Sequence, residues 1–387
     1  MTLTFDEFEA CKRVIKLAEA EGNPYIEHIF NVNRWIQAYE GNEEEAAKIL
    51  KRHLNLRKVM GWDDWPEESE GFDERVDQFA PLSILGQNKD DDNKVVLFEQ
   101  SGKIDIHGLI DNAKVTSFMR AKFRLMERIH RKVIELEKKT GRQSGGLLVM
   151  DLDGLEFRPA LLSLLAGPYR IMWGTLFEQY PQLIRHILIV RAPKFVNLLY
   201  STCIPFIPND YRSRLEICSS SDPSNTLLKH ISASLLPKEY CQGGNADDED
   251  NFEMITIPIP LSPFPPCIDS PVDLDTISVS AGDKLIKKYH WEAGTKLHFY
   301  MKHSEGFHFF IYYSKDDIEN EDLWQEIYAG SERPPLRLCD DWKWETPKSG
   351  YYYLCFGNER AWFFSVTLQY RVFRLIGEHR QVEEAIE

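Results

Sequence analysis

The sequence predicts a multidomain protein that consists of an all-α N-terminal segment, an α/β domain with a mainly parallel sheet, and an all-β sandwich. Three observations carry this prediction. Apolar residues recur at helical spacing in the first 65 residues, short apolar runs alternate with helical stretches in the middle of the chain, and the last third alternates with a period of two. We place these units at residues 1–65, 75–245 and 272–378, with a proline-rich linker at 246–271.

The composition limits the class of protein. The 387 residues are 43% hydrophobic and 12% aromatic, which is typical of folded domains, and the formal net charge is −15. So acidic a protein lacks the basic face that binds nucleic acid, and no nucleic-acid partner is expected. No apolar run reaches the roughly 20 residues that span a bilayer. The acidic N-terminus lacks the basic and apolar segments of a secretory signal, so we expect a cytoplasmic protein.

The cysteines and histidines show no spacing that is typical of a metal site. The seven cysteines are scattered and never form a C-x-x-C pair, and the eleven histidines form no H-x-x-x-H pair. We therefore expect reduced cysteines, no metal site and no cofactor.

The N-terminal segment predicts three helices. Thr4 and Glu7 fit a capping box, in which each side chain accepts a hydrogen bond from the other residue's backbone. Pro24 precedes a second helical run, Gly41 and Asn42 end it, and a third run follows.

The middle of the chain predicts buried strands that alternate with helices. Continuous apolar strands of this kind occur in parallel sheets that helices cover. A sheet covered on one face only, with a helix able to lift off the other, would leave a cavity of the size of a lipid. The stretch 62–93 is acidic and irregular. The predicted strands are 95–98, 147–150 and 186–190, and the predicted helices are 112–140 and 159–177.

The linker combines an acidic run with spaced prolines, which indicates an extended spacer. We therefore expect residues 272–378 to fold alone. Runs rich in aromatic and β-branched residues predict an antiparallel sandwich there. We expect its aromatic cluster, Trp362 and Phe363 included, to form the core. The predicted strands are 276–280, 297–301, 307–313, 351–356 and 363–370.

Several short motifs, taken in order, resemble two known families. The resemblance covers nearly the whole chain, and the order of the motifs is more specific than any one of them. The motifs that resemble the CRAL-TRIO domain and its N-terminal helices are NRWIQA at 33–38, YP at 180–181, ILIVRAP at 187–193, PFI at 205–207, LLKHI at 227–231 and LLPKEY at 235–240. The motifs that resemble a GOLD domain are GTKL at 294–297 and KSGYYYL at 348–354. The combination is similar to the tocopherol-associated protein or supernatant protein factor group.

The resemblance implies a protein without catalytic residues that binds a hydrophobic molecule or lipid in an apolar pocket and carries or presents it between membranes. A mobile gate helix at about 194–208 would close the pocket, and the GOLD domain would bind a protein partner. We expect the pocket to be lined by the floor strands (Leu147, Val149, Ile187, Ile189), a wall helix (Leu161, Leu165, Tyr169, Trp173, Phe177) and the gate (Phe195, Leu198, Leu199, Cys203, Phe206, Ile207).

Four positions match those that hold a charged headgroup in phosphoinositide-transferring relatives. This sequence has Tyr39, Gln182, Tyr211 and Arg214 there, so only one cation remains. The resemblance therefore implies a less polar ligand, such as a prenylated phenol, a sterol precursor or a neutral lipid. Residues 185–239 carry a net charge of +3, from seven Lys or Arg and four Asp or Glu. This charge fits either a solvated face or transient contact with an anionic membrane surface.

Two alternatives remain at this point. Asp151 and Asp153, after an apolar strand, imitate the first motif of magnesium-dependent phosphatases of the haloacid-dehalogenase type. The motif lies in mid-chain, Leu155 stands where a threonine is usual, and no later strand ends in the paired acids that would complete the magnesium site. A strand that ends in a turn at Gly154 is the simpler interpretation. The second alternative is an adaptor, in which the GOLD domain binds a partner and the pocket is vestigial.

Overall fold

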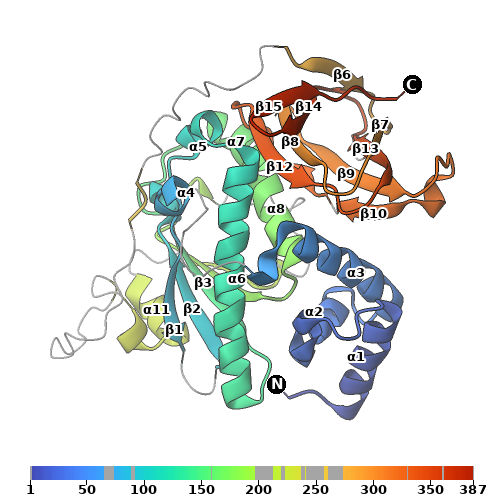
Figure 1. Cartoon of the computed structure of the whole chain (residues 1–387). Coiled ribbons are helices and arrows are strands. Elements are labelled where there is room, and N and C mark those ends of the chain that lie inside the picture. Colours follow the sequence, from blue (N-terminus) through green and yellow to red (C-terminus); the bar gives the residue numbers. More distant parts are fainter. Residues whose placement is uncertain are drawn as a thin grey trace.

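The structure is a computed structural model, and Figure 1 shows the arrangement of its helices and strands. It describes residues 2–64, 74–88, 92–157, 159–196, 212–218, 223–236, 240, 257–259, 273–328, 330–359 and 361–386. The predicted gate residues Leu198, Leu199, Cys203, Phe206 and Ile207, and also Tyr211, lie outside the described residues.

The N-terminal segment consists of α1 (Phe5–Leu17), α2 (Ile29–Ala38) and α3 (Glu43–Met60), as predicted. The capping box is confirmed, because the Glu7 amide donates to Thr4 Oγ1 at 3.2 Å and the Thr4 amide donates to Glu7 Oε2 at 2.8 Å. The three helices pack around a small core of their own, which includes Cys11, Val14, Val32, Trp35 and Leu50.

Two buried ion pairs fix this segment to the long helix α6 (Val115–Thr140). Arg34 of α2 donates to Glu137, and Arg57 of α3 donates to both oxygens of Glu127 at 2.6 and 3.0 Å. All four side chains are at most 5% exposed. Buried charges of this kind are tolerated only when they are paired, so the N-terminal helices are an integral part of the fold.

The α/β domain is built on a five-stranded sheet in the order β1-β2-β3-β4-β5. The strand β1 is antiparallel to β2, and the other neighbours are parallel, which confirms a mainly parallel sheet. The prediction missed β1 and the short helix α4 (Glu74–Phe79), because both lie in the stretch 62–93 that it treated as irregular; the register of β1 also shifts between Ile84 and Gly86. The strands are β1 (Ser83–Gln87), β2 (Lys94–Glu99), β3 (Gly145–Asp151), β4 (Ile184–Val190) and β5 (Leu215–Ile217).

Helices cover both faces of the sheet (Figure 1). One face carries α5 (Ile106–Asn112), α6 and α8 (Arg170–Gln179), and the other carries α11 (Pro223–His230). The predicted helix 112–140 is divided, because Ala113 and Lys114 are extended between α5 and α6. The predicted helix 159–177 is α7 (Pro159–Leu164) and α8, joined by a π-helical turn over Leu165–Tyr169 that contains Pro168.

The C-terminal region is an all-β sandwich of two sheets, ordered β10-β9-β13-β7 with β11 beside β9, and β12-β8-β14-β15 with β6 beside β14. Its first four strands are β6 (Asp275–Val279), β7 (Lys284–Trp291), β8 (Lys296–His303) and β9 (Phe307–Ser314). The remaining strands are β10 (Gln325–Tyr328), β11 (Glu332–Arg333), β12 (Asp340–Glu345), β13 (Gly350–Gly357), β14 (Val366–Ile376) and β15 (His379–Val382).

The sandwich corrects two sequence interpretations. Aromatic rings do fill the core, as the stacked pair Phe299 and Trp342 shows with ring centres 4.9 Å apart. Trp362 and Phe363 do not belong to it, because they are 87% and 83% exposed between β13 and β14. The sandwich also extends to β15, beyond the predicted end at residue 378.

The sandwich is docked on the α/β domain. Leu336 packs into the core of the α/β domain, and the Arg337 amide donates to the carbonyl of Ile110 at 3.0 Å. Asp340 accepts hydrogen bonds from the Thr116 amide at 3.0 Å and from Thr116 Oγ1 at 2.7 Å. The N-cap residue of α6, Lys114, provides no side-chain cap, so a carboxylate from the sandwich caps this helix. This docking differs from the predicted picture of a domain held only by a spacer.

Candidate functional site

The face of the sheet beneath α6 and α8 presents two mainly apolar rows of side chains that cross the parallel strands. One row is Leu97, Leu148, Ile187 and Leu215, and the next is Glu99, Met150, Ile189 and Ile217. Their register places neighbours in each row on the same face. Leu97, Leu148, Ile187 and Glu99 are buried, whereas Met150, Ile189 and Leu215 are only partly buried. Apolar side chains left partly uncovered in the middle of a sheet are the expected floor of a ligand cavity.

The helix α8 provides an aromatic wall beside this floor. Tyr169 and Trp173 meet edge to face with ring centres 6.1 Å apart, and Trp173 and Phe177 lie 5.5 Å apart. The three rings recur every four residues, so they share one side of the helix. Tyr169 is the last residue of the π-helical turn and lies directly before α8. All three pack against the floor and are only partly buried.

The floor ends in a polar corner. Glu99 is buried at the end of β2 and accepts a hydrogen bond from Ser101 Oγ at 2.5 Å. Lys122 of α6 is also buried and donates to the carbonyl of Ala80. Burial raises the pKa of Glu99 and lowers that of Lys122, so each is less readily charged than in water. Both line a hollow of about 20 Å³ with Tyr169 and Trp173, which has room for one polar group.

The four predicted floor residues lie on two opposite faces of the sheet. Ile187 and Ile189 lie on the face just described. Leu147 and Val149 lie on the opposite face with Leu188 and Val190, under α11. These four side chains therefore cannot line one cavity, and the floor residues of β3 are Leu148 and Met150. The prediction was wrong for β3 because an apolar run such as 147–150 does not show which residues point to which side.

The remaining predicted wall residues lie in two adjoining clusters. Tyr169, Trp173 and Phe177 contact the sheet core, as described above. Leu161 and Leu165 belong to a neighbouring cluster around Ile106, which also holds the predicted gate residue Phe195, and Leu164 joins the two clusters. The wall prediction thus selects one continuous apolar region. The polar corner was missed, although a charged residue directly after the apolar run 95–98 was a visible signal.

The predicted headgroup residues do not have equal surroundings. Gln182 is buried in the turn before β4, with a left-handed backbone (φ 58°). Arg214 donates to the carbonyl of Ile184 at 3.3 Å. Tyr39 ends α2 and packs with the N-terminal helices, where burial, followed by Glu178 and Glu45, raises its pKa to about 12.

Asp151 has no free oxygen for phosphatase chemistry. Arg191 donates to both of its carboxylate oxygens, and the Tyr240 hydroxyl donates to Oδ2. Asp151 is buried, whereas Asp153 is more than half exposed. A nucleophilic carboxylate needs access to phosphorus and to magnesium, so the geometry gives the phosphatase alternative no support.

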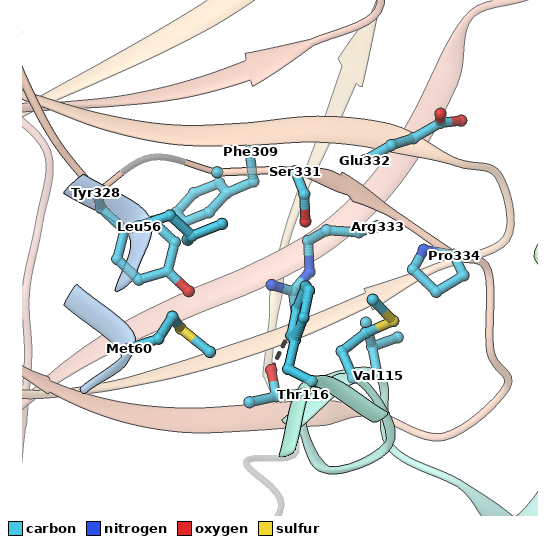
Figure 2. A pocket seen from close by; sticks show the side chains of 13 residues that line it. Leu56, Met60, Val115, Thr116, Phe309, Tyr328, Ser331, Glu332, Arg333 and Pro334 are labelled. Atoms are coloured by element: carbon cyan, nitrogen blue, oxygen red, sulfur yellow. Dashed lines mark hydrogen bonds between the residues drawn. The ribbon is translucent and has the colours of Figure 1, made fainter. Parts of the chain in front are cut away.

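A second cavity lies between the sandwich and the α/β domain (Figure 2). It is lined by Leu56 and Met60 of α3, Val115 of α6, and Phe309 and Tyr328 of the sandwich. Arg333 crosses it and donates to Thr116 Oγ1 at 3.1 Å. Its volume of about 40 Å³ has room for no more than a few water molecules and is far too small for a lipid. It is a packing gap of the docked interface.

Comparisons with known proteins agree with this architecture. The sequence model of the CRAL/TRIO domain family matches residues 82–243, the part of the chain that holds the sheet and α8. The chain carries a CRAL-TRIO domain. Residues 262–383 match the C-terminal domain family named after F28H7.8, so the CRAL-TRIO domain is followed by a region with relatives of its own.

The CRAL-TRIO relatives include proteins of similar length. The CRAL-TRIO domain-containing protein F28H7.8 of Caenorhabditis elegans is 29% identical over 90% of this chain and 85% of its own length. Protein ctg-1 of the same organism is 23% identical over 88% of this chain and 90% of its own. The crystal structure of Sfh5 matches 66% of this chain and 95% of its own, with 18% identity and a TM-score of 0.46. Among the described residues, no helix is both long and apolar enough to cross a bilayer.

Proposed function

We propose that the CRAL-TRIO domain binds one hydrophobic molecule on the floor of β2 to β5 and that the protein carries or presents it between membranes. The observation that carries this proposal is the partly uncovered apolar row through Met150 and Ile189, bounded by the rings of α8. A lipid gains about 0.8 kcal/mol for each CH₂ group that such a surface removes from water. CRAL-TRIO proteins generally bind or transfer lipids, and they are generally not enzymes.

The ligand class follows from the polar corner. Glu99 and Lys122 offer an acceptor and a donor at the end of an otherwise apolar floor. A single hydroxyl or carbonyl suits this corner, whereas a phosphoinositide headgroup would bury several charges without partners. We therefore propose a prenylated phenol, a sterol precursor or a neutral lipid as the ligand.

The test of this proposal is mass spectrometry of an apolar extract of the full-length protein. Met150→Trp places a large ring on the floor and should lower the amount of co-purified or reloaded ligand at least about tenfold. The control is Leu228→Trp, because Leu228 is a partly buried residue of α11 on the opposite face. An extract without ligand, or equal ligand in the Met150→Trp protein and the wild type, would contradict the proposal.

Contact with a membrane is supported by the tip between β13 and β14. Trp362, Phe363 and Phe364 are 79–87% exposed, although monomeric proteins rarely expose three consecutive aromatic side chains. Aromatic side chains partition into the membrane interface, where tryptophan is especially common. We propose that this tip touches the membrane while the ligand is exchanged, in a protein that is otherwise cytosolic.

Replacing all three tip residues with Ser should weaken binding to phosphatidylcholine–phosphatidylserine vesicles at least about tenfold in a flotation assay. Leu323→Ser in the same sandwich is the matched control, since Leu323 is also well exposed but stands alone. If the triple variant floats like the wild type, the tip is not the membrane contact. The resemblance of the sandwich to GOLD domains supports an added role in binding a protein partner.

A further inference from the structure

Three side chains with metal-binding atoms meet on the face of the sheet that α11 covers. They are His186 of β4, Glu216 of β5 and His230 at the end of α11. The carboxylate Oε2 of Glu216 lies 3.6 Å from Nε2 of His186 and 3.4 Å from Nε2 of His230. All three donor atoms lie within 4.8 Å of one another. The group is on the opposite side of the sheet from the proposed lipid floor.

The distances from the Glu216 carboxylate to the two imidazoles distinguish a metal site from a pair of direct hydrogen bonds. At 3.4–3.6 Å, the contacts of Glu216 with the two imidazoles are longer than usual nitrogen–oxygen hydrogen bonds. A tetrahedral metal with bonds of about 2.0–2.1 Å holds neighbouring nitrogen and oxygen ligands about 3.3 Å apart. The observed separations are close to that edge length. The arrangement therefore suits a shared metal ion better than a pair of direct hydrogen bonds.

We propose that His186, Glu216 and His230 bind a divalent transition-metal ion of the zinc class. Two imidazoles and one carboxylate are the ligands of many zinc sites, whereas calcium and magnesium prefer oxygen ligands alone. Three ligands from this chain leave one position for water. The side chains are 21%, 47% and 28% exposed, so an ion reaches them from solvent.

The backbone around the site is held in place. Asn88 Nδ2 donates to the carbonyl of His230 at 2.6 Å, and Asn88 Oδ1 accepts from the Ser232 amide at 3.1 Å. Because Asn88 directly follows β1, these bonds fix the end of α11 against the end of that strand. The strand β5 has only three residues and pairs with β4 through a short ladder. A metal ion would join β4, β5 and α11 at one point and would hold this short strand in the sheet.

The test is titration of the metal-free, full-length protein with Zn²⁺ against a chromophoric chelator, together with the visible absorption of the Co²⁺ form. The wild type should bind one Zn²⁺ that the double variant His186→Gln/His230→Gln does not bind, and Co²⁺ should give the intense band of a tetrahedral site. Glu216→Gln should weaken binding at least about tenfold. The control is His379→Gln, because His379 is an exposed histidine of β15 and its loss should change nothing.

Comparison with the double variant separates this site from zinc bound by cysteines elsewhere in the chain. Circular dichroism establishes that each variant is folded, and Glu216→Gln is the mildest change should a histidine variant fail to fold. Equal zinc stoichiometry and affinity in the wild type, the double variant and Glu216→Gln would overturn the proposal, and the three residues would then be a histidine–glutamate ion-pair cluster only.

Discussion

Replacing Glu127 with Ala should lower the free energy of unfolding by about 3–5 kcal/mol. Glu127 accepts two hydrogen bonds from Arg57 in the buried contact between α3 and α6, and one at 2.6 Å from the hydroxyl of Tyr180, the residue that ends α8. Its removal leaves the Arg57 guanidinium buried between the rings of Tyr25 and Trp62 without its main counter-charge. Since whole domains are stable by only about 5–15 kcal/mol, this is a large fraction of the total.

Urea unfolding followed by circular dichroism measures the effect. Glu135→Ala is the matched control on the same helix, because the Glu135–Lys132 pair is exposed and should contribute less than about 1 kcal/mol. Replacing Glu127 and Arg57 together with Met should recover much of the loss, since no buried charge then remains unpaired. Equal midpoints for Glu127→Ala and Glu135→Ala would mean that the buried pair does not hold the helices together.

Replacing Asp340 with Ala should weaken the docking of the sandwich by about 3 kcal/mol, which corresponds to on the order of a 100-fold rise in the dissociation constant between the two parts. Asp340 is buried, caps the first turn of α6 through Thr116, and pairs with Arg333. The substitution leaves the Arg333 guanidinium, which is itself 9% exposed, without this partner. It also leaves the first turn of α6 without its anion.

A protease site engineered into 246–271 allows the measurement. After cleavage, the two parts of the wild type should elute together from a sizing column at micromolar concentration, and those of Asp340→Ala should separate. Asp111→Ala is the control, because the Asp111–Arg337 pair crosses the same interface but is exposed. Joint elution of the Asp340→Ala parts at the same dilution as the wild type would show that apolar packing around Leu336 alone is sufficient.

The order of helices and strands was largely predictable from sequence, because apolar periodicity reports burial directly. The capping box at Thr4 and the strands 95–98 and 186–190 illustrate this, since each is a local pattern with one physical cause. The strand β7 was missed because four of its eight residues are Lys or His, which hides the alternation. The docking of the sandwich was missed because it depends on single polar pairs such as Thr116 with Asp340.

The candidate site was predictable only as a region. The rings Tyr169, Trp173 and Phe177 follow from helical spacing, and the structure places them on one side of α8. The faces of β3 were not predictable, because all of its central residues are apolar. Convergence of His186, Glu216 and His230 could not be seen either, since they are brought together only by the pairing of β4 with β5 and by the position of α11.

The cap that Asp340 places on α6 can form only long after the ribosome has made the helix. The two residues that form it, Thr116 and Asp340, are 224 positions apart in the chain. A ribosome adds about 5–20 residues each second, so roughly 11–45 s pass between the synthesis of Thr116 and that of Asp340. During that interval the first turn of α6 in the nascent CRAL-TRIO domain lacks its cap, and Leu336 does not yet cover the apolar core residues that it packs against. Nascent chains that stall within the sandwich should therefore be the ones that chaperones retain.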